Sequence, residues 1–174
     1  DRSAALKKQD KKGNDWYLSE KMVGMMLYLD KFSENLSNFE KRIDYLADLG
    51  VTYVHFMPLL QSREGQNDGG YAVSDYLNVD KRFGTTEQFE HVIDRLKKKG
   101  IRTCIDFVLN HTAKEHEWAL KSRKNEPGYE DMYYMFDNYG IPSEYEKTLT
   151  EIFPQVAPKN FTYYEDIGCL LYTS

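Results

Sequence analysis

The chain has 174 residues, enough for one domain with a full hydrophobic core. Hydrophobic residues make up 41% and charged residues 29% of it, the balance of an ordinary water-soluble globular protein. The net charge of −5 does not suggest a nucleic-acid partner, and no run of about 18 apolar residues predicts a membrane span. Its two cysteines, Cys104 and Cys169, have no metal-ligand spacing and cannot form a framework of several disulfides.

The first predicted elements are a strand, a helix and a second strand. Residues 22–32 are apolar on both faces, as expected of a buried strand. Ser37 and Glu40 have the spacing of a capping box at the start of the helix, and Gly50 is a suitable stop. Residues 51–60 are dense in β-branched and aromatic side chains and predict the second strand.

The same pattern then recurs, with Gly100 in the place of Gly50. Thr85 and Gln88 form a second possible capping box, and residues 101–109 predict a third strand. Strand–helix–strand units build parallel sheets, so we expect an α/β fold. Two architectures fit this pattern, an open doubly wound sheet and a (β/α)8 barrel.

The connection after the first strand favours the barrel. Residues 30–34 contain no glycine, whereas an open nucleotide-binding sheet normally holds phosphate with a glycine-rich loop there. In both folds the functional groups lie on loops after the carboxyl ends of the strands. The polar stretch GQNDGGYAVSDY (65–76) and the pair Asn110-His111 are therefore expected at the same edge of the sheet.

The polar residues near this edge each have a functional and a structural interpretation. Asp106 lies in an apolar strand, where a carboxylate is costly unless it is paired, so it could anchor the structure or serve a site. Asp68 could be a turn residue beside two glycines, and Tyr71 has the same ambiguity. His55 is expected to be a satisfied histidine of the core or barrel lining. Two carboxylates at one edge invite comparison with glycoside hydrolysis, which their spacing alone does not establish.

From about residue 112 the periodicity fails. The segment is rich in Tyr, Pro, Glu and Asp, with one short helix expected near residues 115–123. It predicts an irregular subdomain inserted after the third strand.

Residues 24–168 resemble the α-amylase superfamily, family 13 of the glycoside hydrolases, and look most like its amylosucrase branch. Gly50–Pro58 resembles the second-strand signature of the family, and Asp106–His111 resembles its third-strand motif. Residues 65–76 resemble the amylosucrase form of the loop after strand two, with Gly-Tyr-Ala where other branches usually have Gly-Tyr-Asp. Two further segments resemble amylosucrases in the inserted domain, His111–Trp118 and Thr148–Pro154.

The resemblance implies the first three βα units of a (β/α)8 barrel over residues 21–111 and part of an inserted domain B over 112–168. Residues 1–20 would be the tail of a preceding helical domain or a linker. Residues 169–174 depart from amylosucrase sequences and resemble the translation of a sequencing adapter. They are therefore expected to be a non-native read-through tail.

The resemblance also implies retaining transglucosylation, in which sucrose donates its glucosyl unit to an α-glucan acceptor and fructose leaves. Asp68 would close the floor of the glucosyl pocket, Tyr71 would stack on the sugar ring, and His111 would hydrogen-bond the glucosyl hydroxyls. Asp106 would order the site without acting as the nucleophile, and Asn110 would have a structural role.

The nucleophile, the acid/base and the third carboxylate of the family would lie beyond residue 174, so this chain alone is expected to be inactive. No cofactor is expected. Asn110 matches a calcium-binding residue of many α-amylases, but its companion ligands are not found, so no metal is expected.

The expected partners are small sugars, with neither nucleic acid nor membrane. No targeting signal is readable, which favours a cytoplasmic location and leaves the compartment open. The alternative activities are those of an α-glucosidase, a sucrose hydrolase or an α-amylase of the same superfamily. An alternative of another class is a non-catalytic sugar-binding protein.

Overall fold

The computed structural model divides the chain into two compact units. The first consists of Asp1–Leu59 and Asn78–Phe107, and the second of Leu60–Leu77 and Val108–Ser174. The residues that the structure describes are 4, 7, 8, 11, 15–152, 154, 155 and 158–172. Parts of the predicted tails at 1–20 and 169–174, and Phe153 of the segment likened to amylosucrases, lie outside the described residues.

These units differ from the division expected from the sequence. Leu60–Leu77 belongs to the second unit, although it falls inside the range 21–111 assigned to the barrel. The reason is local pairing, because β3 and β4 form a two-stranded sheet of their own. The domain boundaries read from the sequence stay a prediction.

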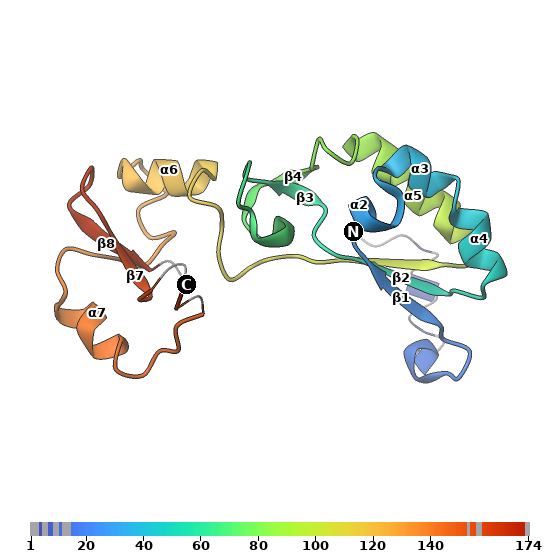
Figure 1. Ribbon diagram of the computed structural model, residues 1–174, viewed down its shortest axis with the longest axis horizontal. Coiled ribbons are helices and arrows are strands. Elements are labelled where there is room, and N and C mark those ends of the chain that lie inside the picture. Colours follow the sequence, from blue (N-terminus) through green and yellow to red (C-terminus); the bar gives the residue numbers. More distant parts are fainter. Residues whose placement is uncertain are drawn as a thin grey trace. The chain divides into compact units, whose positions relative to one another are not determined.

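The first unit is built on a three-stranded parallel sheet in the order β1-β2-β5 (Figure 1). Its strands are β1 (Gly24–Leu27), β2 (Tyr53–Phe56) and β5 (Arg102–Ile105). In register, Tyr53 lies opposite Gly24 on one side and Arg102 on the other. The remaining elements of the unit are the 3-10 turn η1 (Asp15–Leu18) and the helices α2 (Leu29–Ser33), α3 (Leu36–Glu40), α4 (Ile43–Asp48) and α5 (Thr86–Lys98). Two successive strand–helix–strand crossovers of this kind are the building units of a barrel.

One face of this sheet packs against the helices through a line of aromatic rings. Phe56 of β2 is fully buried and contacts Phe39 of α3 at a centroid distance of 4.9 Å and Phe89 of α5 at 5.7 Å, both edge-to-face. Such pairs add about 0.5–1.5 kcal/mol each to the stabilisation from buried area. The helices α3 and α5 therefore both contact the central strand through the Phe56 side chain.

The opposite face of the sheet is more polar. Side chains alternate along a strand, so Tyr53 and His55 of β2 point away from Val54 and Phe56. Cys104 of β5 is partly buried there as a free thiol. Its hydrogen bond to Tyr53 raises the pKa of that phenol to about 12.

Helix α5 begins as the sequence predicts. The Thr85 side chain accepts a hydrogen bond from the Gln88 backbone N–H at 3.2 Å, and the Gln88 side chain accepts one from the Thr85 N–H at 2.9 Å. Gly100 follows the helix with a φ of +77°, as a glycine stop requires.

The predicted capping box at Ser37 and Glu40 is wrong. Helix α3 begins at Leu36, and Asn35 caps it by accepting a hydrogen bond from the Asn38 N–H at 3.0 Å. Asn caps a helix as well as Ser does, and this earlier start places Leu36 in the core with no exposed surface.

The three strands are shorter than predicted. Residues 22–32 contain β1 and then α2, because Leu29 is buried in the helical layer. The second strand ends at Phe56, two residues before Pro58, which lacks the N–H that a ladder needs. The third ends at Ile105, so Asp106 lies just beyond it.

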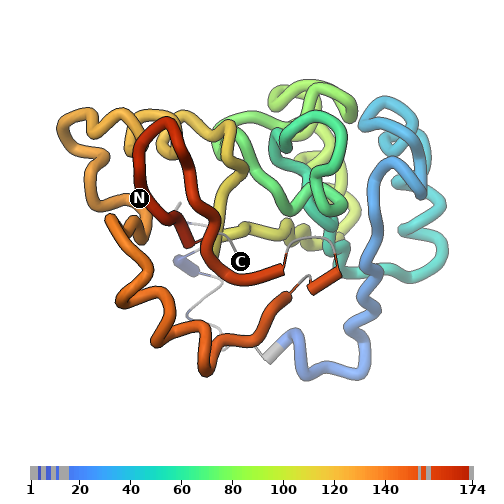
Figure 2. Tube along the Cα trace, turned by 60° about the vertical axis from the view of Figure 1, so that its left-hand side comes forward, coloured from blue at the N-terminus to red at the C-terminus, as the bar shows by residue number. Residues whose placement is uncertain are grey.

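The second unit joins a short hairpin-like sheet to an irregular part. Strand β3 (Leu60–Ser62) pairs with β4 (Val73–Val79), and the 3-10 turn η2 (Asp68–Gly70) lies between them. The irregular part contains α6 (Glu117–Arg123), close to the helix expected near 115–123, and α7 (Gly140–Tyr145). Its antiparallel sheet has the order β6-β8-β7, from Met135–Phe136, Cys169–Tyr172 and Phe161–Tyr164. The red segments in Figure 2 include β7 and β8 of this sheet.

Across the described residues, no helix has the length and apolar character to span a membrane.

The glycine before the α5 cap gives the first testable prediction. Gly84 has a φ of +142°, and a Cβ there would lie 3.1 Å from Leu36 Cδ1 and against the Gln88 side-chain oxygen. Gly84→Ala should destabilise the protein by about 1–3 kcal/mol, because it strains the backbone and displaces half of the capping box. Thermal unfolding measures the loss. Gly24→Ala is the control, since its Cβ would make only ordinary contacts, 3.5 Å or longer. An unchanged melting temperature for Gly84→Ala would contradict this account.

Candidate functional site

In the first unit, Asp106 is paired with His55. The Asp106 Oδ1 lies 2.7 Å from His55 Nε2, and the two side chains are 21% and 28% exposed. The Asp106 backbone N–H also donates to the Phe56 carbonyl at 3.2 Å. His55 is thus the satisfied histidine that the sequence suggested. Its partner is the carboxylate that could not remain alone in an apolar strand.

In the second unit, Asp68 occupies a tight turn that presents its carboxylate to solvent. Asp68, Gly69 and Gly70 have φ values of +51°, +67° and +99°, so three successive residues are left-handed. The Asn67 carbonyl accepts hydrogen bonds from the Gly70 and Ala72 N–H groups at 3.0 and 3.1 Å, which closes the turn. Asp tolerates this backbone better than most residues. Asp68 is therefore a turn residue whose exposed side chain is also available to a ligand.

Strand β4 connects this turn to the segment that follows β5. The Ala113 N–H donates to the Val73 carbonyl at 2.7 Å. The Tyr76 hydroxyl lies 2.6 Å from the Val108 carbonyl and 3.1 Å from the His111 carbonyl. The two polar stretches expected at one edge are thus joined by hydrogen bonds within the second unit. Tyr71, partly buried, lies at the end of η2 and leads into β4.

Asn110 and His111 are neighbours with exposed side chains. The Asn110 Nδ2 lies 3.3 Å from His111 Nδ1, and an amide nitrogen can only donate. This contact makes Nδ1 the acceptor, so the proton of the neutral ring is carried by Nε2. In this tautomer His111 offers an Nε2–H donor to a ligand, and the contact with Asn110 favours it.

An aromatic cluster that sequence reasoning missed supports this segment. Tyr76, His116 and Trp118 have ring centroids 4.6 to 5.6 Å apart, with Tyr76 and Trp118 stacked. His116 is only 4% exposed and caps α6, since its Nδ1 accepts a hydrogen bond from the Trp118 N–H at 3.1 Å. Histidine is an uncommon cap, so local sequence patterns gave no signal for this role.

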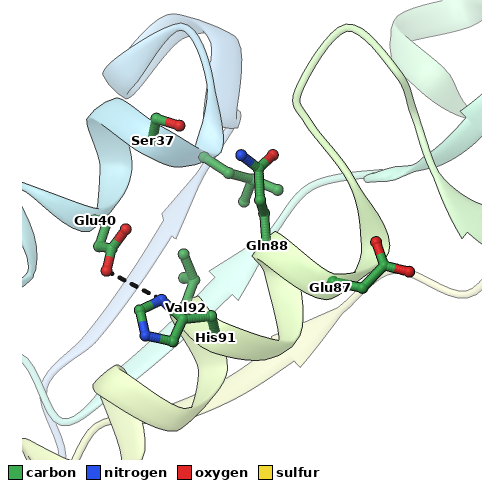
Figure 3. Close-up of a pocket in the computed structure, with 7 residues that line it drawn as sticks. Ser37, Glu40, Glu87, Gln88, His91 and Val92 are labelled. Atoms are coloured by element: carbon green, nitrogen blue, oxygen red, sulfur yellow. Dashed lines mark ion pairs between the residues drawn. The ribbon is translucent and has the colours of Figure 1, made fainter.

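The pocket in Figure 3 lies between α3 and α5 of the first unit and has a volume of about 200 Å³. Its polar centre is Glu40, whose Oε1 lies 3.1 Å from His91 Nδ1 and 3.0 Å from Arg95 Nη1. The lining residues are Leu36, Ser37, Glu40, Glu87, Gln88, His91 and Val92. None of the predicted site residues is among them.

The described part of the chain contains no group of three His, Cys, Asp or Glu side chains placed to hold a metal ion. The second unit offers an exposed carboxylate acceptor at Asp68, an exposed imidazole at His111 and a partly buried tyrosine ring at Tyr71. These are groups that bind a polyol with an apolar ring face.

The cap on α6 gives a prediction about pH. Burial lowers the pKa of His116 below its ordinary value of 6.5, and protonation would remove the Nδ1 acceptor that caps the helix. The folded state therefore binds fewer protons than the unfolded state, so this contribution to stability is complete above pH 6.5 and is lost as the pH falls below it.

His116→Asn keeps a capping acceptor that does not titrate. Its melting temperature should fall less than that of the wild type between about pH 7.5 and about pH 5. Thermal unfolding at several pH values measures the difference. His111→Asn is the control, because that side chain is exposed. Equal pH slopes for wild type and His116→Asn would contradict the prediction.

Comparison with known proteins identifies the family. The family model "Alpha amylase, catalytic domain" matches residues 5–164. Maltase 1 of Drosophila virilis is 38% identical over 115 residues, which are 66% of this chain and 18% of the maltase. A trehalose synthase of Pimelobacter sp. (strain R48) is 36% identical over 129 residues, 74% of this chain and 22% of the synthase. The chain thus spans about a fifth of the length of these curated relatives.

Solved structures agree with this family. A mutant of the trehalulose synthase MutB superposes with a TM-score of 0.76 at 27% identity, covering 92% of this chain and 29% of that one. The isomaltulose synthase SmuA from Protaminobacter rubrum gives a TM-score of 0.74 at 25% identity, covering 87% and 27%. The predicted fold class, a partial (β/α)8 barrel, is confirmed. The family model matches most of the length of this chain. The chain therefore belongs to the α-amylase family of glycosidases and transglycosidases, as part of the catalytic domain.

Proposed function

We propose that the protein transfers an α-glucosyl unit from a small α-glucoside, with sucrose as the leading donor and an α-glucan as the acceptor. The observation that carries the proposal is the joining of two polar stretches, 65–76 and 108–113, by the hydrogen bonds of β4 in a chain of the α-amylase family. The Gly-Tyr-Ala sequence at Gly70–Ala72, which resembles amylosucrases, supports sucrose. A structure of MutB in complex with its substrate sucrose, at a TM-score of 0.75 and 28% identity, adds support.

Each of three side chains has a role in holding the glucosyl ring. The Asp68 carboxylate accepts hydrogen bonds from two neighbouring sugar hydroxyls, which an acceptor-only group with two oxygens can do at once. The His111 Nε2–H donates to a hydroxyl oxygen, in the tautomer that Asn110 sets. The Tyr71 ring packs on the apolar face of the sugar.

Asp106 keeps the ordering role that the resemblance implies and does not act as the nucleophile. Its carboxylate is already bound to His55 at 2.7 Å, which leaves it poorly suited to attack a glucosyl carbon. Asp68 binds the sugar hydroxyls in this proposal, so it is not the nucleophile either. Retaining hydrolysis needs two further carboxyl groups about 5–5.5 Å apart, one as nucleophile and one as acid/base. We assign both to other parts of the whole protein, so residues 1–174 alone should have no glycosidase activity.

Hydrolysis of maltose-like or isomaltose-like sugars is the second candidate. It is supported by the 38% identity to Maltase 1 of Drosophila virilis and the 36% identity to an oligo-1,6-glucosidase of Heyndrickxia coagulans. The same three side chains would hold the same glucosyl unit, and water would take the place of the sugar acceptor. The two candidates therefore differ at the acceptor and share the binding side of the site.

A substrate panel distinguishes these candidates. The protein expressed from its complete gene is incubated separately with sucrose, maltose, isomaltose and starch, and fructose, glucose and α-glucan are measured. Fructose release with growth of an α-glucan is the expected result. Glucose release from maltose or isomaltose with sucrose untouched favours the second candidate. Starch cleavage with none of the small sugars consumed rules out both.

The binding role of Asp68 has its own test. Asp68→Asn keeps the size of the side chain and a residue that accepts the left-handed backbone, but removes the charge. Losing a charge-assisted hydrogen bond should lower kcat/KM roughly 10- to 100-fold, with the melting temperature nearly unchanged. Asp48→Asn, at an exposed position of α4, is the matched control. Unchanged kcat/KM for Asp68→Asn would exclude the carboxylate from sugar binding.

A further inference from the structure

The turn from Val108 to His111, which carries the His111 imidazole, depends on side chains from outside it. Residues 107–110 form no helix or strand, and Leu109 is 83% exposed, so burial of this residue does not hold the turn in place. In the part of the chain that the structure describes, the backbone N–H groups of residues 108–112 donate to no backbone carbonyl. Something else must therefore fix the backbone that presents the imidazole.

The Tyr76 hydroxyl is placed to do this. It lies 2.6 Å from the Val108 carbonyl and 3.1 Å from the His111 carbonyl, which are the two ends of the turn. A hydroxyl has one proton, so it donates mainly to the nearer carbonyl or shares the proton between both. Either arrangement holds the two ends of the turn at one point.

The Tyr76 ring is itself held in place. Trp118 stacks on it with an interplanar angle of 28°, and the buried His116 ring lies 5.3 Å away. Burial also raises the pKa of the Tyr76 phenol, so the hydroxyl keeps its proton at neutral pH. The position of the hydroxyl is thus set by β4 and by the start of α6, independently of the turn that it binds.

We propose that Tyr76 is a positioning residue for sugar binding: its hydroxyl closes the turn from Val108 to His111, and so fixes the direction and the tautomer of the His111 imidazole. The inference rests on the proposed role of His111 in binding the glucosyl unit. The link to the tautomer is Asn110, which belongs to the same turn and donates to His111 Nδ1 at 3.3 Å.

A double-mutant cycle tests this on the protein expressed from its complete gene. Tyr76→Phe keeps the stacked ring and removes the hydroxyl. It should lower kcat/KM about tenfold, mainly through KM, because one hydrogen bond to the turn is lost. In a His111→Ala background the same change should have almost no effect, since the residue through which Tyr76 acts is gone.

The matched control is Tyr129→Phe, which removes a tyrosine hydroxyl bonded to Lys121 in the same unit. It should leave kcat/KM unchanged in both backgrounds. Equal losses from Tyr76→Phe in both backgrounds would mean a purely structural role and would overturn the proposal. An unchanged kcat/KM for Tyr76→Phe would overturn it as well.

A second readout does not need activity. In protein with ¹⁵N-labelled histidine, the ring nitrogen shifts of His111, assigned by their loss in His111→Ala, should report the Nε2–H tautomer. In Tyr76→Phe they should move towards a mixture of tautomers. Unchanged shifts would overturn the positioning role, whatever the substrate. If His111→Ala keeps full activity while Tyr76→Phe moves the shifts, the turn is positioned as inferred and only the sugar-binding role of His111 fails.

Discussion

The alternation of side chains along β2 is the constraint on which the rest of the first unit depends. Val54 and Phe56 are fully buried beneath the helices, so Tyr53 and His55 must face the other side of the sheet. His55 then stands where the chain leaves β5, and it meets Asp106 at 2.7 Å. One strand thus sets both the packing of α3 and α5 and the polar pair on the opposite face.

In the second unit, the residue proposed to bind the sugar, Asp68, also forms a turn. Sequence reasoning treated Asp68 as either a turn former or a site residue. In the structure its left-handed backbone is part of the turn closed by Asn67, and this geometry leaves the carboxylate exposed. Glycines at the next two positions let the chain reverse without a side chain beside that carboxylate.

Beyond the fold class and the joining of the two polar stretches, what the sequence could predict was local. The Thr85–Gln88 capping box and the stop at Gly100 depend on residues within one or two turns, and both are present. The contacts of Tyr76 with Val108 and His111 join residues 32 and 35 positions apart, and no periodicity records them. The cap of α3 failed for another reason: Asn35 and Ser37 are both good caps, and only the burial of Leu36 decides between them.

Residue 72 is the position at which the Gly-Tyr-Ala sequence of this chain differs from the Gly-Tyr-Asp that is usual in other branches of the family. Ala72 donates its N–H to Asn67 at 3.1 Å and accepts from the Arg63 N–H at 3.0 Å, so its backbone is fully engaged in closing the connection from β3 to β4. Those bonds do not involve its side chain. An Asp in its place, as in Gly-Tyr-Asp, would keep both bonds and add a carboxylate one residue after Tyr71. A carboxylate can therefore be added beside Tyr71 at this position without altering the turn that holds Asp68.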